Sequence, residues 1–323
     1  MEKIICLGFG NYLIDIAQFC KKNSLDFDWY SSKRQYFNNN QYEIKTKKNL
    51  KKLKINPKIV NNINNLTDLK NNILVISIGS PFIIKEKFLK RFSNKIINFH
   101  ASPLPQFRGG GGFSWRILSN DRNGAITFHL IDKGIDTGPI IFQKKFIYPN
   151  TLRYPIDYQD FTYIKYKDSI NLILEKIING KSFKLIYQKP NLSSYFPRLN
   201  TNLQGYIDWN WEGKEIERFI LAFSYPYDGA STFVEKRLTR IYDCSFFKLK
   251  KFQHSFNYGL VFKYIKNYFY VICKGGYLKI KNLNLKTPKK IIIGDKLYTP
   301  QKKIEDANEI RIKYNDKGLF LKK

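Results

Sequence analysis

Apolar residues along the first half of the chain form short runs typical of buried strands. These runs occupy residues 4–8, 72–78, 95–99, 124–131 and 139–146. Between the earlier runs lie helix-like stretches at residues 11–22 and 81–92. Strands that alternate with helices are typical of βαβ units, in which a parallel sheet is covered on both faces. The pattern therefore predicts an α/β fold with a Rossmann-like, mainly parallel sheet and helices on both faces.

The pattern changes after residue 187, which indicates a second domain. Residues 170–178 have the spacing of a core-facing helix, which ends the first domain. The following stretch is rich in Pro, Ser and Asn and is typical of a linker. One amphipathic helix and several short apolar runs come next, as in a meander or small barrel. We expect a catalytic domain of residues 1–187, a linker of 188–206 and a smaller β-barrel-like (OB-like) domain of 207–323.

The charge of the chain is strongly positive and has two explanations. The sequence contains 56 Lys and Arg against 26 Asp and Glu, which gives a formal net charge of +30. Such an excess is typical of proteins that bind nucleic acid. However, only 11 of these residues are Arg, and Lys, Asn, Ile, Phe and Tyr, which have A/T-rich codons, are abundant. Arg is the better phosphate ligand but is the scarcer residue here, so we favour codon bias over a dedicated nucleic-acid surface as the origin of the charge.

The cysteines and the apolar runs indicate where in the cell the protein is located. Cys6, Cys20, Cys244 and Cys273 are far apart and form no paired motif, so they are expected to be reduced. No apolar segment reaches the length of a membrane span, and the start of the chain does not resemble a secretory signal. We expect a cytoplasmic protein that does not insert into a membrane. A homodimer is one assembly that the sequence permits.

Candidate chemistry gathers where two predicted strands end. Asn98 and His100 are two residues apart in one strand, so their side chains share a face at its carboxyl end. Open α/β sheets bind their ligands at that edge. Asp136 lies in a glycine-flanked turn between two later strands. The three residues together predict a site with an amide donor, an imidazole and a carboxylate.

Other kinds of site are less consistent with the residues. The glycines at 109–112 lack the Lys and Ser or Thr of a phosphate-binding loop, and the glycines at 8 and 10 lack a third one. A hydrolase triad with Ser102 fails because Ser102 is two residues from His100 in a proline-rich loop. No second His or Cys has metal-ligand spacing to His100, so no metal is expected. His129 is interpreted as a packed histidine of a strand, and His254 as a loop residue.

Two segments carry a family resemblance. IINFHASPLPQFRGG, followed by GAITFHLIDKGIDTGPIIFQ, resembles the core of the formyltransferases that use 10-formyltetrahydrofolate. That family includes enzymes acting on methionyl-tRNA, glycinamide ribonucleotide and nucleotide-linked amino sugars. Its Asn-x-His pair and downstream Asp are matched by Asn98, His100 and Asp136. The resemblance covers residues 1–185 strongly and extends more weakly through the second domain.

The resemblance implies the roles of these residues. An acceptor amine attacks the formyl carbon, and tetrahydrofolate leaves through its N10. Asn98, helped by His100, would stabilise the developing oxyanion, while Asp136 would orient His100 and relay protons. The formyl donor would be 10-formyltetrahydrofolate, with no metal. The residues implied to hold the donor are Phe82, Ile84, Ser102, Leu104, Asp132, Gly134 and Ile135.

The acceptor is the least determined part of the prediction. The entry helix of the second domain and the positive charge suit methionyl-tRNA as acceptor. The basic segment after the second strand, however, lacks the Gly-, Arg- and Pro-bearing insertion typical of tRNA enzymes. The segments YPYDGASTF and IGDKLYTPQKKI also resemble the amino-sugar branch. We therefore favour a nucleotide-linked amino sugar, with initiator tRNA as the alternative and a non-catalytic, basic nucleic-acid-binding protein as a third, less favoured hypothesis.

Overall fold

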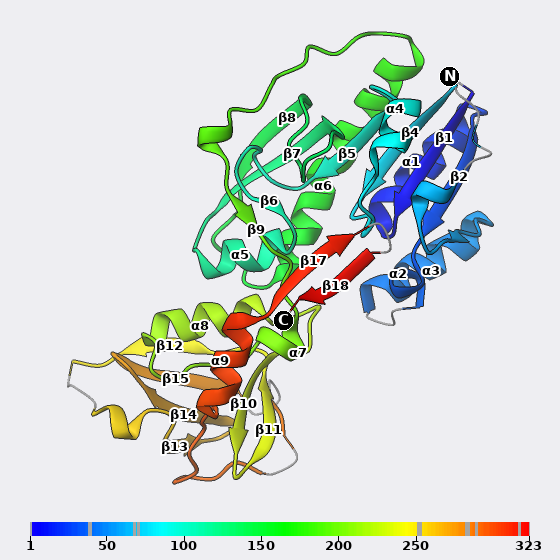
Figure 1. Ribbon diagram of the computed structural model, residues 1–323. Coiled ribbons are helices and arrows are strands. Elements are labelled where there is room, and N and C mark those ends of the chain that lie inside the picture. Colours follow the sequence, from blue (N-terminus) through cyan, green and yellow to red (C-terminus); the bar gives the residue numbers. More distant parts are fainter. Residues whose placement is uncertain are drawn as a thin grey trace.

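The computed structural model describes residues 2–37, 41–66, 69, 72–250, 254–281, 285–287, 290–315 and 318–322 (Figure 1). Within these ranges, a seven-stranded sheet in the order β3-β2-β1-β4-β5-β7-β8 forms the centre of the first domain. The strands are β1 (Lys3–Gly8), β2 (Asp26–Ser31), β3 (Lys58–Ile59), β4 (Ile73–Ile78), β5 (Ile96–His100), β7 (Asn123–Leu130) and β8 (Ile140–Ile147). The strands from β3 to β5 are parallel, whereas β7 and β8 are antiparallel to their neighbours. The predicted mainly parallel sheet is confirmed.

Helices cover both faces of this sheet, as predicted. The helices of this domain are α1 (Asn11–Lys22), α2 (Lys33–Phe37), α3 (Gln41–Leu53), α4 (Glu86–Arg91), α5 (Gly112–Leu118) and α6 (Pro155–Ile178). Of these, α1, α3 and α6 contribute to the core on one face of the sheet and α4 to the core on the other. Side chains alternate along β1: Ile4 and Cys6 join the core beneath α1 and α6, whereas Ile5 and Leu7 join the core beneath α4. Each of these four side chains is at most 1% exposed. A strand buried on both faces therefore appears in the sequence as a continuous apolar run.

Two helices differ from their predicted extent. The helix expected over residues 81–92 begins only at Glu86, and residues 81–85 form a loop at the sheet edge. The helix expected over 170–178 is the last part of α6, which begins at Pro155. Tyr158, Thr162 and Tyr166 carry its buried face over the first turns. Because these residues are aromatic or polar, an aliphatic periodicity does not reveal them.

The C-terminal domain contains α8 (Gly213–Ala222) and antiparallel sheets. One sheet has the order β10 (Ala230–Val234), β11 (Arg237–Ile241) and β16 (Leu285–Lys286), and the other β12 (Ser245–Lys248), β15 (Gly276–Lys281), β14 (Tyr268–Cys273) and β13 (Val261–Ile265). Ile216 and Ile220 of α8 pack in one core with Val261 and Phe269 of the second sheet. The predicted fold class, an α/β sheet domain with a smaller β domain, is confirmed.

The remaining elements lie outside the three sheets described above. They are β6 (Arg108–Gly109), η1 (Ile63–Asn65), η2 (Pro190–Leu192), β9 (Tyr195–Phe196), α7 (Thr201–Gln204), η3 (Ser255–Asn257), α9 (Gln301–Glu309), β17 (Arg311–Asn315) and β18 (Gly318–Lys322). After α9 the chain leaves the C-terminal sheets, and β17 and β18 form a hairpin beside the first domain (Figure 1). The backbone N–H of Ile83 donates to the carbonyl of Asn315 at 3.0 Å. The end of the chain therefore contacts a loop of the catalytic domain.

Candidate active site

The end of β5 brings an amide and two imidazoles together. Asn98 of β5 stands opposite His129 of β7 in the antiparallel register. The Asn98 Nδ2 lies 3.1 Å from the His129 Nε2, while the His129 Nδ1 lies 2.8 Å from the carbonyl oxygen of Leu130. An Nδ1–H that donates to this carbonyl leaves Nε2 as the acceptor for the Asn98 amide. His129 therefore fixes the orientation of the Asn98 amide.

Asp136 lies on a turn that only particular backbone conformations allow. Its own φ is +55°, and Gly138 follows where any Cβ would stand 1.9 Å from the carbonyl oxygen of Leu130. Asp132 supports the turn, because its Oδ1 accepts a hydrogen bond from the Gly134 N–H at 3.0 Å. The glycines around Asp136 thus let the turn fold tightly against β7 and direct the carboxylate towards β5.

Two hydrogen-bond donors and two imidazoles surround the carboxylate of Asp136. Its Oδ1 accepts from the Asn98 Nδ2 at 3.3 Å and lies 3.5 Å from the His129 Nε2. Its Oδ2 accepts from the Gly109 N–H at 2.8 Å and lies 3.6 Å from the His100 Nδ1. Burial alone would raise the pKa of this carboxyl, but the nearby histidines and the Gly109 N–H hold the pKa well below its usual range. Asp136 is therefore an ionised carboxylate at neutral pH.

The ring of His100 lies between two acceptors. Its Nε2 is 2.7 Å from the carbonyl oxygen of Phe107, and its Nδ1 faces Asp136. The Phe107 ring in turn lies under the buried guanidinium of Arg116, at 4.2 Å from the ring centroid. Arg116 also forms an ion pair with Asp121 at 2.9 Å. The imidazole is thus held in one plane, where it can accept or return a proton without reorienting.

The segment predicted as a linker forms part of this site. β9 pairs in parallel with β6, so that the Arg108 N–H donates to the Ser194 carbonyl at 2.9 Å. The Gln188 Nε2 donates to the carbonyls of Asp136 and Gly138, at 2.9 and 2.8 Å. Its Oε1 accepts from the Arg108 Nη2 at 2.7 Å. Gln188 therefore ties the turn of Asp136 to β6, and the linker is a structural support of the site.

A cavity of about 680 Å³ opens over these side chains. Asn98, His100 and Asp136 all line it. The residues expected to hold the donor that also line it are Phe82, Ile84, Ser102, Asp132, Gly134 and Ile135. Leu104 is not among the lining residues and is 3% exposed; its carbonyl accepts from the Gln143 Nε2 at 3.0 Å. The structure thus brings nine of the ten predicted residues to one cavity, and Leu104 lies behind it.

Sequence reasoning misses two residues of the site. His129 is 2% exposed, as expected for a packed histidine, yet its Nε2 reaches both Asn98 and Asp136. Only the pairing of β7 with β5 places it there. Gln188 gives no signal in the sequence, because it stands in a polar loop 52 residues from Asp136. Both act through contacts between segments that are distant in the sequence.

Within the described ranges, no group of three or more His, Cys, Asp or Glu side chains could hold a metal ion. No helix in the same residues is long and apolar enough to cross a membrane.

A cavity with an ionised carboxylate, two imidazoles and an amide at a sheet edge can move protons and stabilise a developing negative charge, as an enzyme active site does. The family model described as formyl transferase matches residues 19–150, and the model of the formyl transferase C-terminal domain matches residues 201–298. The chain belongs to the formyltransferase family, and its chemistry is formyl transfer.

The sequence relatives and the structural neighbours include two branches of the family. The methionyl-tRNA formyltransferase of Finegoldia magna is 26% identical over 248 residues, which span 75% of this chain and 77% of that protein. Among solved structures, a sugar 3N-formyltransferase in the presence of dTDP and 5-N-formyl-THF has a TM-score of 0.66 and 26% identity, covering 90% of this chain and 99% of that one. An N-formyltransferase from Helicobacter canadensis, solved with folinic acid and dTDP-3-aminofucose, also has a TM-score of 0.66, at 23% identity.

Proposed function

We propose that this enzyme transfers the formyl group of 10-formyltetrahydrofolate to the amino group of a nucleotide-linked amino sugar. The observation that carries the acceptor assignment is the match to the sugar 3N-formyltransferase, whose chain is covered almost completely. A methionyl-tRNA formyltransferase from Clostridium thermocellum has a TM-score of 0.50 and 78% coverage of this chain. Phe82, Ile84 and Asp132 to Ile135 all line the cavity, and the two sugar N-formyltransferase neighbours were solved with folate ligands; both observations support folate as the donor.

The geometry assigns a task to each group in this reaction. The amine nitrogen forms a bond to the formyl carbon, the bond from that carbon to N10 breaks, and a proton passes from the new ammonium to N10. The Asn98 N–H that reaches Asp136 at 3.3 Å is the one that a formyl oxygen can compete for, because its hydrogen bond is long. This N–H would stabilise the negative charge that develops on the formyl oxygen.

Proton transfer is the task of His100 and Asp136. The ionised Asp136 is an acceptor for the proton that the attacking amine must lose, and His100 lies 3.6 Å away to receive or return it. A positioned acid or base typically contributes about 10²–10⁴-fold to the rate. The Gly109 N–H, which donates to Oδ2 at 2.8 Å, holds the carboxylate in place during this exchange.

Purified enzyme tests the acceptor assignment directly. It is incubated with 10-formyltetrahydrofolate and either a dTDP-linked amino deoxy sugar or charged initiator tRNA, and the product is identified by mass spectrometry. Formylation of the sugar nucleotide, lost in His100→Ala, is the expected result. Formylation of the tRNA alone would overturn the assignment of the acceptor and leave formyl transfer intact.

Methionyl-tRNA is the second candidate acceptor, and a specific observation favours it. The curated sequence relatives that match over about three quarters of the chain are methionyl-tRNA formyltransferases. The net charge of +30 would also attract a polyanion. Strong salt dependence of the acceptor KM is expected for tRNA and a weaker one for a sugar nucleotide, since fewer phosphates are neutralised.

A further inference from the structure

The C-terminal hairpin of β17 and β18 is anchored to the catalytic domain and to the linker. Ile312 is 5% exposed, and its backbone forms an antiparallel bridge with Arg198 of the linker. The Asn315 carbonyl accepts the N–H of Ile83, which lies in the loop expected to hold the donor. Just before the hairpin, the Ile310 carbonyl accepts from the Gln204 Nε2 at 3.2 Å. The hairpin is thus fixed along its length against the walls of the active-site cavity.

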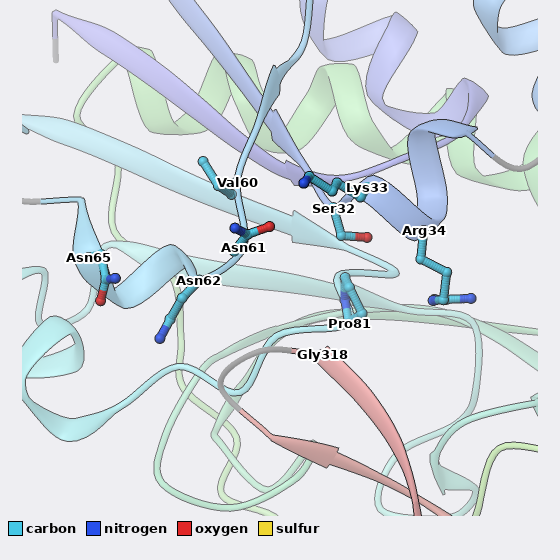
Figure 2. A pocket seen from close by; sticks show the side chains of 9 residues that line it. All are labelled: Ser32, Lys33, Arg34, Val60, Asn61, Asn62, Asn65, Pro81 and Gly318. Atoms are coloured by element: carbon cyan, nitrogen blue, oxygen red, sulfur yellow. The ribbon is translucent and has the colours of Figure 1, made fainter.

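The hairpin adjoins a second hollow beside that cavity. Figure 2 shows this cavity of about 550 Å³, with Gly318 of β18 close to Pro81 on one side. Its other lining residues are Ser32, Lys33, Arg34, Val60, Asn61, Asn62 and Asn65. Gly318 lines the second cavity, whereas Tyr314 lines the active-site cavity. The hairpin therefore borders both cavities.

Tyr314 is the hairpin residue that reaches the active-site cavity. Residues alternate along β17, so Ile312 and Tyr314 face the body of the protein while Lys313 is exposed. The Tyr314 hydroxyl lies so close to Gly110 that a Cβ there would be 2.8 Å from it. Gly110 follows Gly109, whose N–H binds Asp136. The phenol therefore stands on the wall next to the groups that carry the chemistry.

The position of Tyr314 along this wall indicates which substrate it meets. The side of the cavity expected to hold the donor is formed by residues 82–84 and 132–135. The linker, the C-terminal domain and the hairpin also line the cavity, through Arg198, Leu199, Thr201, Phe223, Tyr227 and Tyr314. An acceptor amine has to approach Asn98 and His100 from the side that the donor leaves open. At Gly110 a Cβ would meet both the Tyr314 hydroxyl, at 2.8 Å, and the Arg198 side chain, at 2.9 Å. Tyr314 therefore shares its wall with the linker, from which an acceptor can approach these groups.

We propose that Tyr314 is an acceptor-binding residue, which contacts the amine-bearing substrate through its ring and hydroxyl. The inference rests on the proposed function only in requiring a phosphate-bearing amine acceptor. A phenol supplies a large contact surface with few rotatable bonds and one polar end, which suits a nucleotide or sugar surface. The residue lies beyond position 298, where the match to the C-terminal family model ends. Recognition of the acceptor is thus assigned in part to a segment outside the shared family domains.

Steady-state kinetics of three variants of the full chain test this proposal. Tyr314→Ala removes the ring, Tyr314→Phe keeps the ring and removes the hydroxyl, and Lys313→Ala is the control on the exposed face of the same strand. The acceptor is whichever of the two candidate substrates the wild-type enzyme formylates. Tyr314→Ala is expected to raise the acceptor KM about ten-fold or more, while the donor KM stays within about two-fold. Lys313→Ala is expected to change neither constant.

The outcomes separate the role of Tyr314 from other failures. A Tyr314→Ala enzyme whose acceptor KM is unchanged, or whose donor KM rises equally, would overturn the proposal. Thermal unfolding of each variant shows whether the hairpin still folds. If Tyr314→Ala does not fold, Tyr314→Phe provides the test. A rise in its acceptor KM without a rise in its donor KM supports the proposed contact, and an unchanged acceptor KM refutes it. A wild-type enzyme that formylates neither acceptor refutes the proposed function, and this inference falls with it.

Discussion

Replacing Asp136 by asparagine removes the charge at the centre of the site and keeps the volume of the side chain. The side-chain carbonyl of the introduced asparagine can still accept the Gly109 N–H, which reaches Oδ2 at 2.8 Å in the wild type. The new amide NH₂ would then stand in place of Oδ1, which accepts from the Asn98 Nδ2 at 3.3 Å. Two donors face each other there, so the Asn98 amide loses one partner. The variant therefore lacks the proton acceptor and has a displaced oxyanion donor.

The expected loss of rate follows from these two defects. Removal of a positioned proton-transfer group costs about 10²–10⁴-fold in kcat. That range corresponds to about 2.7–5.4 kcal/mol in the activation free energy. KM for the donor is expected to change little, because the loops at residues 82–84 and 132–135 are untouched. Formyl transfer is measured by single-turnover mass spectrometry of the product, with circular dichroism as the control for folding. A folded variant that keeps more than about a tenth of the wild-type kcat would refute the assignment.

The same variant has a defined effect on the pH dependence of stability. The pKa of Asp136 is depressed in the folded protein, so the ionised carboxylate stabilises the fold fully above the unfolded pKa of about 4. This stabilisation is lost as the pH falls through the folded pKa. The difference in urea unfolding free energy between wild type and Asp136→Asn is therefore expected to be constant near neutral pH and to shrink below about pH 4. A difference that grows on acidification would show that Asp136 is not held ionised.

Three further predictions concern groups around the site and in the core. Gln188→Ala is expected to lower kcat about ten-fold, because the Asp136 and Gly138 carbonyls lose their donor. The control Lys189→Ala, at an exposed neighbouring position, is expected to leave kcat unchanged. Equal kcat in both variants would contradict the role of Gln188. Arg116→Ala is expected to lower the urea unfolding free energy by about 3–5 kcal/mol, because the fully buried ion-pair partner of Asp121 is lost. A decrease below about 1 kcal/mol would contradict a stabilising role of Arg116. Burial raises the pKa of Cys20 and Cys273 to about 12, and all four cysteines are buried, so a thiol reagent at about pH 8 is expected to label the protein only on unfolding. Labelling of the native protein, detected by mass spectrometry, would show that a thiol is accessible.

Local sequence patterns predicted much of the fold. The apolar run of β1 and the alternation in β5 depend on neighbours along the chain, which is why the strands and the shared face of Asn98 and His100 could be inferred. The resemblance added Asp136, which a turn motif alone would not single out. The first turns of α6 gave no aliphatic pattern, because Tyr158, Thr162 and Tyr166 are buried without being aliphatic. Their environment is set by the sheet and the C-terminal domain.

The sequence by itself determined the fold class, the family and the chemistry of the residues at the end of β5. Only the tertiary structure decided that His129 orients Asn98, that Gln188 holds the turn of Asp136, and that Tyr314 borders the cavity. The physical reason is the range of the interactions. Strand alternation and helical periodicity arise between residues close in the sequence, whereas these three contacts depend on the register of antiparallel strands and on the packing of the linker and the C-terminal hairpin against the sheet domain.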